Sequence, residues 1–202
     1  MPAEAMTFAD RAESEPERIA RGLRQRDLAL LAGLVERYQY RLVRYLVYLL
    51  GRRDQVEDLV QETWLRVLER GRQYDCRFRF EPWLFAIARH LALDHLRARQ
   101  AVSLGGLDTA AGEVASCRAA TDPSPFEVTA RNLDAARVAR CLDTLEPVCR
   151  EALLLRFQEE MSLQEIARIV QAPLTTVSSR IYRGLAALRA RLAEEEDTHG
   201  RT

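Results

Sequence analysis

Residues 162–174 constrain the fold most, because the signals that start and stop a helix agree within this stretch. Ser162 and Glu165 have the spacing of a capping box, in which a serine hydroxyl binds the third backbone N–H of a helix and the glutamate reaches back. A helix is therefore predicted to begin at Leu163. Its apolar positions at helical spacing are Leu163, Ile166, Ala167 and Val170. Pro173 disfavours helix in the residue before it, so the helix is predicted to end there.

A second helix is predicted to start near Thr175 or Thr176. Its apolar face carries Val177, Ile181, Leu185, Leu188 and Leu192, and its polar face carries Thr176, Ser179, Arg180 and Arg183. Residues 173–192 contain four arginines and no acidic residue. A short helix-turn-helix with a basic polar face is typical of a recognition helix in a DNA major groove. The alternative is a surface helix whose arginines are only solvated.

The charge of the chain is zero overall but unevenly distributed. Residues 24–100 carry fifteen arginines against ten acidic residues, and residues 131–192 carry ten against seven. The two segments are therefore net +5 and +3, within an acidic frame. With 202 residues the chain is long enough for two small domains, and these two basic segments mark them.

The cysteines and histidines predict neither a metal site nor a cofactor. Cys76, Cys117, Cys141 and Cys149 form no C-x-x-C pair, and the three histidines have no ligand spacing with them, so we expect ordinary thiols. The first 23 residues lack the apolar core of a signal peptide. The longest apolar run, residues 45–50, is far shorter than the about 20 residues of a membrane span. We therefore expect a cytoplasmic protein.

The first domain is predicted over residues 24–100, after a polar leader over residues 1–23. Residues 24–50 keep a helical apolar period, with Gly51 as a cap. A second helix over residues 54–70, closed by Gly71, turns Val56, Val60, Thr63 and Val67 inward. On its other side Asp58, Gln61, Glu62 and Leu65 fall at spacings of three, four and seven. This set is expected to form an exposed stripe.

Residues 72–83 form a predicted loop in which aromatic residues alternate with arginines. Tyr74, Phe78, Phe80 and Trp83 are too close together for one short segment to bury them all. Aromatic rings beside arginines can stack on unpaired bases. The alternative is that Phe80 and Trp83 are core residues at the start of the next helix, which is predicted to run from about Pro82 to Arg99.

Residues 101–125 are predicted to be a linker, because glycine, proline, serine and alanine replace the apolar period there. Helical periodicity resumes over residues 126–145, Pro147 opens a helix to about Gln158, and the helix-turn-helix follows. A second domain is thus predicted over residues 126–193, with an acidic tail over residues 194–202. The expected fold is all-α: two small helical domains joined by a flexible linker, the second with a helix-turn-helix.

These blocks together resemble the extracytoplasmic-function sigma factors of bacterial RNA polymerase, from about Leu31 to Leu192. In the first domain the resemblance is carried by residues 57–64 (EDLVQETW), by Phe80 with residues 83–89 (WLFAIAR), and by Asp94 with Arg97. In the second domain it is carried by residues 145–147 (LEP), Arg150, residues 153–155 (LLL), Ser162, residues 165–167 (EIA), Thr176, Val177, Ser179, Arg180, Ile181 and Arg183.

The resemblance implies a role for each block, and no catalytic residue. The exposed stripe would bind the coiled coil of the β′ subunit through Asp58, Gln61, Glu62 and Leu65. The linker would thread through the β and β′ core. The minus-ten element would be opened and read by Tyr74, Phe78, Phe80, Trp83, Arg89, His90 and Arg97. The minus-thirty-five element would be read from the helix-turn-helix, residues 163–182, by Thr175, Thr176, Ser178, Ser179, Arg180 and also Arg183. An anti-sigma factor is a further implied partner.

Three residues depart from the family pattern. Thr175 replaces a usual glycine, Ser178 replaces a frequent basic residue, and His90 replaces a usual asparagine. Two other classes of protein stay open. A helix-turn-helix regulator that does not dock on polymerase has no use for the aromatic loop, and a helical adaptor leaves both basic segments unexplained.

Overall fold

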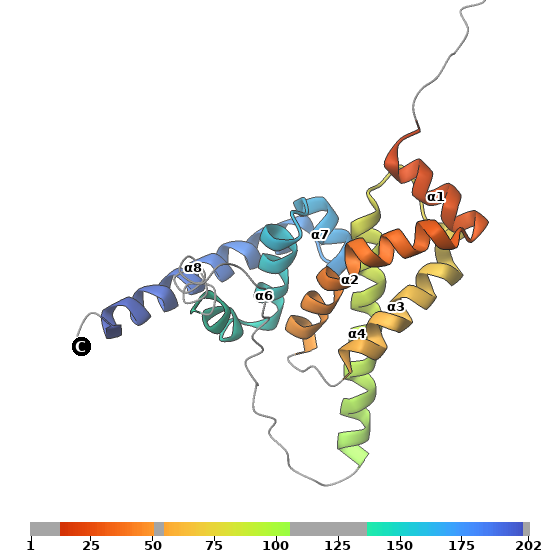
Figure 1. Ribbon diagram of the computed structural model, residues 1–202. Helices are drawn as coiled ribbons and strands as arrows, with labels where there is room; N and C mark the ends of the chain where they lie inside the picture. The colour runs from red at the N-terminus through yellow and green to blue at the C-terminus, as the bar shows by residue number, and fades with distance from the viewer. Residues whose placement is uncertain (1–12, 51–54, 106–136, 200–202) are drawn as a thin grey trace, which may run out of the picture.

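A computed structural model describes residues 13–50, 55–105 and 137–199 of the chain. Within these ranges every regular element is a helix, which confirms the all-α prediction. Figure 1 shows the helices in two groups, α1 to α4 and α6 to α8, as predicted for two helical domains. In the described ranges no helix is long and apolar enough to cross a membrane.

Helix α1, Glu15–Gln25, corrects the prediction that residues 1–23 form a polar leader. Ser14 caps it, with its hydroxyl accepting from the Glu17 backbone N–H while the Glu17 carboxylate accepts from the Ser14 backbone N–H. The helix buries Ile19, Ala20 and Leu23 against the domain. The sequence carried this signal, because Ser14 and Glu17 have the same spacing as the capping box at residue 162. Residues 1–12 lie outside the described ranges.

Helices α2, Leu28–Leu50, and α3, Val56–Arg70, confirm two predicted helices. The predicted start of the first at residue 24 is wrong, because α1 ends at Gln25 and Arg26 follows with a φ of +55°. Asp27 starts α2 by accepting from the backbone N–H groups of Ala29 and Leu30. The predicted cap Gly51 lies outside the described ranges. After α3, Gly71 opens the short 3₁₀ helix η1, Gly71–Gln73, with an ordinary φ of −56°. A glycine is needed there because a Cβ would lie 2.9 Å from the Cβ of Leu23 on α1.

Helix α4 spans Phe80–Gly105, so it starts slightly earlier and ends later than predicted. Its last residues lie inside the predicted linker over residues 101–125, which corrects the start of that linker. Residues 106–136 lie outside the described ranges. They include the rest of the predicted linker and the first part of the helix predicted over residues 126–145. Helical structure is again present over residues 137–143.

The second domain continues with α6, Pro147–Leu153, which runs into a π-helical turn, η2, Leu154–Gln158. Helix α7, Leu163–Val170, has the predicted capping box and ends at Gln171, whose φ is +52°. Helix α8, Leu174–His199, starts one residue before the predicted Thr175. It also continues through most of the residues predicted as an acidic tail, which is a correction to that boundary.

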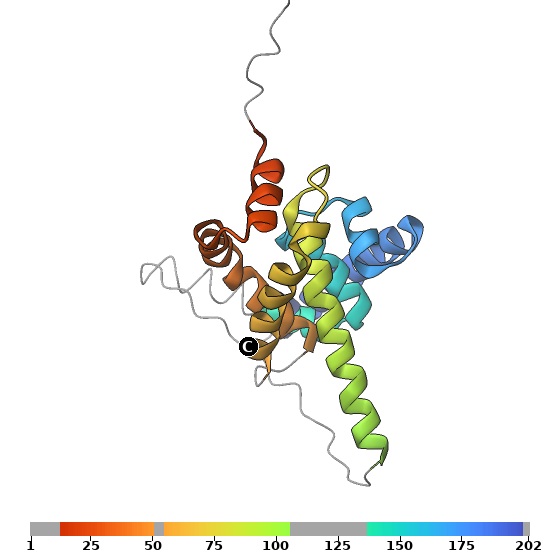
Figure 2. The ribbon, with the colours of Figure 1, turned by 90° about the vertical axis from the view of Figure 1, so that its right-hand side faces the viewer.

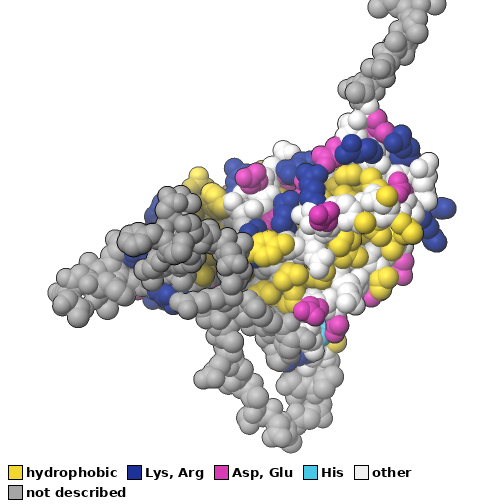
Figure 3. Space-filling model, in the orientation of Figure 1, with side chains coloured by type: hydrophobic (Ala, Val, Ile, Leu, Met, Phe, Trp, Pro, Cys, Tyr) yellow, Lys and Arg dark blue, Asp and Glu magenta, His cyan; other side chains and the backbone are white. Residues whose placement is uncertain are grey.

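The two domains pack against each other, although they are far apart in sequence. Helix α7 lies on α4, and α6 lies on α2. Figure 2 shows α4 between α3 on one side and the helices of the second domain on the other. One continuous cluster of buried apolar side chains includes residues of both domains. Figure 3 shows hydrophobic, acidic and basic side chains interspersed over α2 and α3 on the face turned to the viewer.

Candidate nucleic-acid interface

The first turns of α8 present the predicted polar face to solvent. Thr175, Ser179 and Arg183 are exposed, while Val177 and Ile181 are buried on the opposite side. Thr176, Ser178 and Arg180 are half-buried and flank the exposed centre. Gly184 lets α8 approach α6 closely, because a Cβ there would lie 2.9 Å from Cδ1 of Leu153. The buried side of α8 therefore fixes which polar side chains face outward.

Tyr182 is a residue of this face that the sequence analysis did not single out. Its side chain is 76% exposed, although it is large and aromatic. It follows Thr175 by seven residues and Ser179 by three, so helical spacing places it at the centre of the exposed face. This spacing in the sequence could have identified Tyr182 as part of the polar face. Nearby, Nη1 of Arg183 lies 3.8 Å from Oε2 of Glu146, an exposed pair that contributes little to stability.

The predicted stripe lies on the solvent side of α3 and is here called the α3 stripe; it consists of Asp58, Gln61, Glu62 and Leu65. Asp58, Gln61 and Leu65 are exposed, and Glu62 is half-buried. Opposite them, Val56, Val60, Thr63 and Val67 are buried, as predicted. Nε of Arg66 donates to Oε1 of Glu62 at 2.9 Å. The stripe therefore combines acidic and amide groups with one exposed leucine.

The four aromatic rings of the predicted loop do not share one exposed platform. Tyr74 and Phe80 are only 4% and 2% exposed, with their ring centroids 5.5 Å apart, and Trp83 is half-buried against both. The Tyr74 hydroxyl also donates to the Phe78 carbonyl oxygen at 2.7 Å. This corrects the expectation of base stacking for Tyr74 and Phe80, which are core residues in this structure. Phe78, at 47% exposed, is the open ring of the four.

A buried carboxylate, Glu81, supports this aromatic cluster and was missed in the sequence. Its Oε1 accepts from the Tyr38 hydroxyl at 3.0 Å and lies 3.4 Å from Nη2 of Arg79. Burial raises the pKa of Glu81, but hydrogen bonds from its own backbone and from Tyr38, together with the Arg79 charge, lower it more. The net pKa of Glu81 lies below its ordinary value, so the carboxylate stays ionised in the fold.

The three remaining residues predicted for the minus-ten region lie on α4. His90 and Arg97 are exposed, and both approach Asp94, at 3.5 Å and 3.0 Å. Arg89 points elsewhere: its Nε donates to Oε1 of Glu151, in the second domain, at 2.7 Å. The structure therefore brings His90 and Arg97 together on an open surface and separates Arg89 from them.

Two family models match the chain: Sigma-70 region 2 at residues 34–102 and Sigma-70, region 4 at residues 135–188. The ECF RNA polymerase sigma factor SigX of Bacillus subtilis is 30% identical over 159 residues, covering 77% of this chain and 80% of that protein. The chain belongs to the ECF sigma factors. The ECF RNA polymerase sigma factor SigE of Mycolicibacterium smegmatis is 34% identical, covering 80% of this chain and 61% of that longer protein.

A solved structure shares the fold of this sigma factor. It is the sigma factor RpoE in complex with the anti-sigma factor NepR from Bartonella quintana, with a TM-score of 0.63 and 22% identity. The match covers 80% of this chain and 96% of that one. As an ECF sigma factor the chain binds core RNA polymerase and directs promoter-specific initiation of transcription. Membership in this family favours the sigma factor over both alternatives, the regulator that does not dock on polymerase and the helical adaptor.

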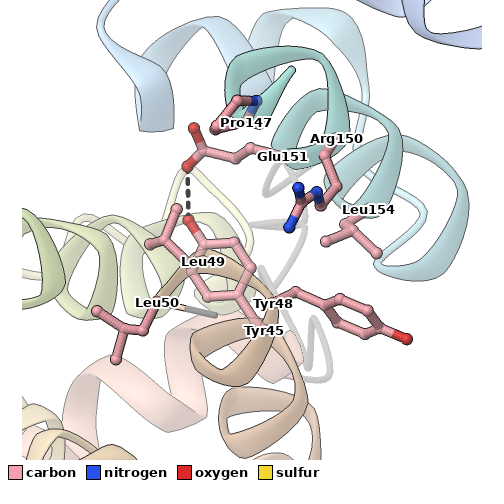
Figure 4. Close-up of a pocket in the computed structure, with 8 residues that line it drawn as sticks. All are labelled: Tyr45, Tyr48, Leu49, Leu50, Pro147, Arg150, Glu151 and Leu154. Atoms are coloured by element: carbon pink, nitrogen blue, oxygen red, sulfur yellow. Dashed lines mark hydrogen bonds between the residues drawn. The ribbon is translucent and has the colours of Figure 1, made fainter. Parts of the chain in front are cut away.

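Some residues that matter to this sigma factor had no local signal in the sequence. On α2, Tyr45 hydrogen-bonds Glu151. Arg41 and Arg44 hydrogen-bond Glu159. In each pair the glutamate follows more than a hundred residues later. Figure 4 shows one of these contacts, the hydrogen bond from the Tyr45 hydroxyl to Glu151. A contact across that separation leaves no periodic trace in either segment.

Proposed function

We propose that this sigma factor binds core polymerase through the α3 stripe and promoter DNA through two separate surfaces. The exposure of the stripe, opposite the buried face of the same helix, is the observation that carries the proposal. The domain built from α1 to α4 acts as the polymerase-binding and minus-ten domain, and the domain with α6 to α8 acts as the minus-thirty-five domain. The chain contributes promoter choice and no catalytic residue.

The α3 stripe suits a protein partner with basic and apolar groups. Asp58 and Glu62 supply negative charge, Gln61 supplies an amide, and Leu65 supplies apolar area. An interface of this kind gains orientation from its charges and affinity from the buried leucine. We assign this surface to the coiled coil of the polymerase β′ subunit, as the family resemblance implies.

The minus-ten surface is assigned to Phe78, Trp83, His90 and Arg97. Phe78 offers an open ring for stacking on an unpaired base, and Arg97 offers a guanidinium for the backbone. Tyr74 and Phe80 support the loop from beneath through their ring contacts. His90 donates or accepts hydrogen bonds where the family usually has an amide.

The minus-thirty-five surface is assigned to the exposed face of α8. Ser179 and Arg180 lie in its second turn, near the helix start, where base edges are usually reached. Arg183 is one turn further along and is shared between base and phosphate contacts. Thr175, Thr176 and Ser178 surround the N-terminus of the helix, where backbone N–H groups favour a phosphate.

Two further assignments depend on the relatives. The Bartonella structure holds an anti-sigma factor, and we propose that this chain is also restrained by one. We place the protein in the cytoplasm, where polymerase works.

Run-off transcription tests the proposal as a whole. Sigma-free core polymerase is mixed with the full chain and a promoter library from the same genome, and transcripts are sequenced. We expect initiation at a defined set of promoters with common elements near minus ten and minus thirty-five. Specific DNA binding by the chain without any initiation would support the regulator instead.

A further inference from the structure

Glu151 on α6 is a carboxylate of the second domain that is hydrogen-bonded by Tyr45 and Arg89 of the first domain. Its side chain is almost fully buried, with 5% of the residue exposed. Oε1 accepts from the Tyr45 hydroxyl at 2.8 Å and from Nε of Arg89 at 2.7 Å, and Nη2 of Arg89 lies 3.4 Å from Oε2. Figure 4 shows Glu151 and Tyr45 pointing toward each other across the boundary between α6 and α2.

Glu159 repeats this arrangement at the end of η2. The residue is 2% exposed, and each carboxylate oxygen meets one arginine of α2. Nε of Arg41 donates to Oε2 at 2.7 Å, and Nη2 of Arg44 donates to Oε1 at 2.9 Å. Two buried carboxylates of one domain are thus held by three arginines of the other.

These three arginines, Arg41, Arg44 and Arg89, are here called the arginine surface. Arg41 also lies over the rings of Tyr38 and Phe85, at 5.2 Å and 5.8 Å from their centroids, which hold its guanidinium in place. A buried charge is costly without a partner, so neither the carboxylates nor the arginines can stay inside unpaired. When the domains separate, the arginine surface is left exposed on a segment with net charge +5.

The apolar packing beside Glu151 is incomplete. A cavity of ≈ 210 Å³ lies between the domains, lined by Tyr48, Leu49 and Leu50 of α2 and by Pro147 and Leu154 of the second domain. Nε of Arg44 is also buried without a hydrogen-bond partner. This pocket is partly open to solvent, and an unpaired buried donor weakens an interface. Apolar side chains of both domains also pack in one continuous cluster, so the ion pairs act together with that packing to keep the domains closed.

We propose that Glu151 and Glu159 hold this sigma factor in a closed state by occupying an arginine surface that binds nucleic-acid phosphates when the domains separate. Arginine binds carboxylate and phosphate with the same planar pair of donors, so one group can replace the other. Closure and phosphate binding by Arg41, Arg44 and Arg89 are then mutually exclusive. The inference rests on the proposed function for its DNA partner, but the closed state itself does not.

The test uses the full chain with Glu151→Gln and Glu159→Gln together. Glutamine keeps the size of the side chain and removes the charge that holds the arginines. Small-angle X-ray scattering should show a larger radius of gyration. Affinity for a short labelled duplex of mixed sequence should rise about tenfold if about one molecule in ten is open in the natural protein. The control is Glu160→Gln, which removes the same charge from an exposed neighbour and should change neither quantity.

A second variant, Arg41→Ala with Arg44→Ala, distinguishes the closed state from phosphate binding by the arginine surface. It should also open the chain, because Glu159 loses both partners, but it should not bind the duplex more tightly. Circular dichroism distinguishes opening from unfolding. If the glutamine variant fails to fold, the arginine variant decides: an unchanged radius of gyration would overturn the closed state.

Equal gains in DNA affinity for the glutamine and arginine variants would overturn the role of the arginine surface in phosphate binding. Neither measurement contains polymerase. A failure of run-off transcription therefore counts against the proposed function alone, and a failure of opening counts against this inference alone.

Discussion

The guanidinium carbon of Arg168, on α7, lies 4.4 Å from the ring centroid of Phe78, in the loop before α4. The pair joins the helix-turn-helix to the ring assigned to base stacking. Cation–π contacts of this kind, at a partly exposed site, contribute about 0.5 to 1 kcal/mol. A base that stacks on the same face of Phe78 must therefore displace the exposed side chain of Arg168.

Phe78→Ala is expected to impair promoter opening while leaving the fold intact. The ring is half exposed, so its removal creates no internal cavity, whereas a lost base stack weakens the open complex by about 1 to 3 kcal/mol. Permanganate footprinting of holoenzyme on a promoter measures melted thymines directly. Natural levels of thymine reactivity in the variant would return Phe78 to a packing role.

Phe80→Ala is expected to act on stability instead. Its ring is buried among Tyr38, Tyr74 and Trp83, so truncation leaves a cavity and should lower the free energy of unfolding by about 3 to 5 kcal/mol. Urea unfolding followed by circular dichroism measures this. A loss below about 1 kcal/mol would contradict the assignment of Phe80 to the core.

Glu62→Arg is expected to weaken binding to core polymerase without unfolding the chain. Loss of one partner of a charge pair that is buried on binding costs about 2 to 5 kcal/mol, and Arg at this position also removes that partner. Loss of the exposed contact to Arg66 should cost only about 0.3 to 0.5 kcal/mol of stability. Co-purification with core polymerase is the measurement, and Glu36→Arg, an exposed glutamate on α2, is the matched control. Equal retention of both variants would exclude the α3 stripe as the docking face.

Arg180→Ala and Arg183→Ala are expected to differ in how they affect DNA. Loss of a bidentate contact to guanine removes about 1 to 3 kcal/mol of discrimination at one position, whereas loss of a phosphate contact weakens all sequences and lowers the salt slope by about one. We expect the first pattern for Arg180 and a mixture for Arg183. Holoenzyme binding to variant upstream elements at several salt concentrations distinguishes them.

Arg189→Ala is the control for this pair, since Arg189 is exposed on α8 beyond the recognition face. It should leave both specificity and salt slope unchanged. If all three variants behave like the natural protein, α8 is not the recognition helix.

Glu81 is expected to make stability fall in acid. Its pKa in the folded state lies below the ordinary value of 4.5, so the ionised form stabilises the fold above that pH. As the pH falls below 4.5 and through the folded pKa, the carboxylate takes up a proton and this contribution is lost. Thermal unfolding over that pH range should show a shallower decline for Glu81→Gln than for the natural protein. Parallel declines would show that other groups dominate acid unfolding.

Local sequence signals, such as capping residues and the apolar period, predicted helices well where they were present. The capping box at Ser162, the apolar period of α2 and the α3 stripe are all present as predicted. Helix α1 was not predicted, although Ser14, Pro16 and Glu17 gave a similar capping signal. The polar composition of the segment led to its interpretation as a leader. The ends of α4 and α8 ran further than predicted, since a helix does not need apolar residues once it has left the core.

The sequence by itself determined which residues can share a helix face, because that depends only on the helical repeat. Tertiary structure alone decided which of those faces are covered. Phe80 and Phe78 are two residues apart in an aromatic segment, yet one is buried by Tyr38 and Tyr74 and the other is half exposed. Glu159 resembles its exposed neighbour Glu160 in sequence, but it is buried because Arg41 and Arg44 come from another domain to pair with it. Burial of a charge depends on a distant partner, and spacing along one chain segment carries no information about that partner.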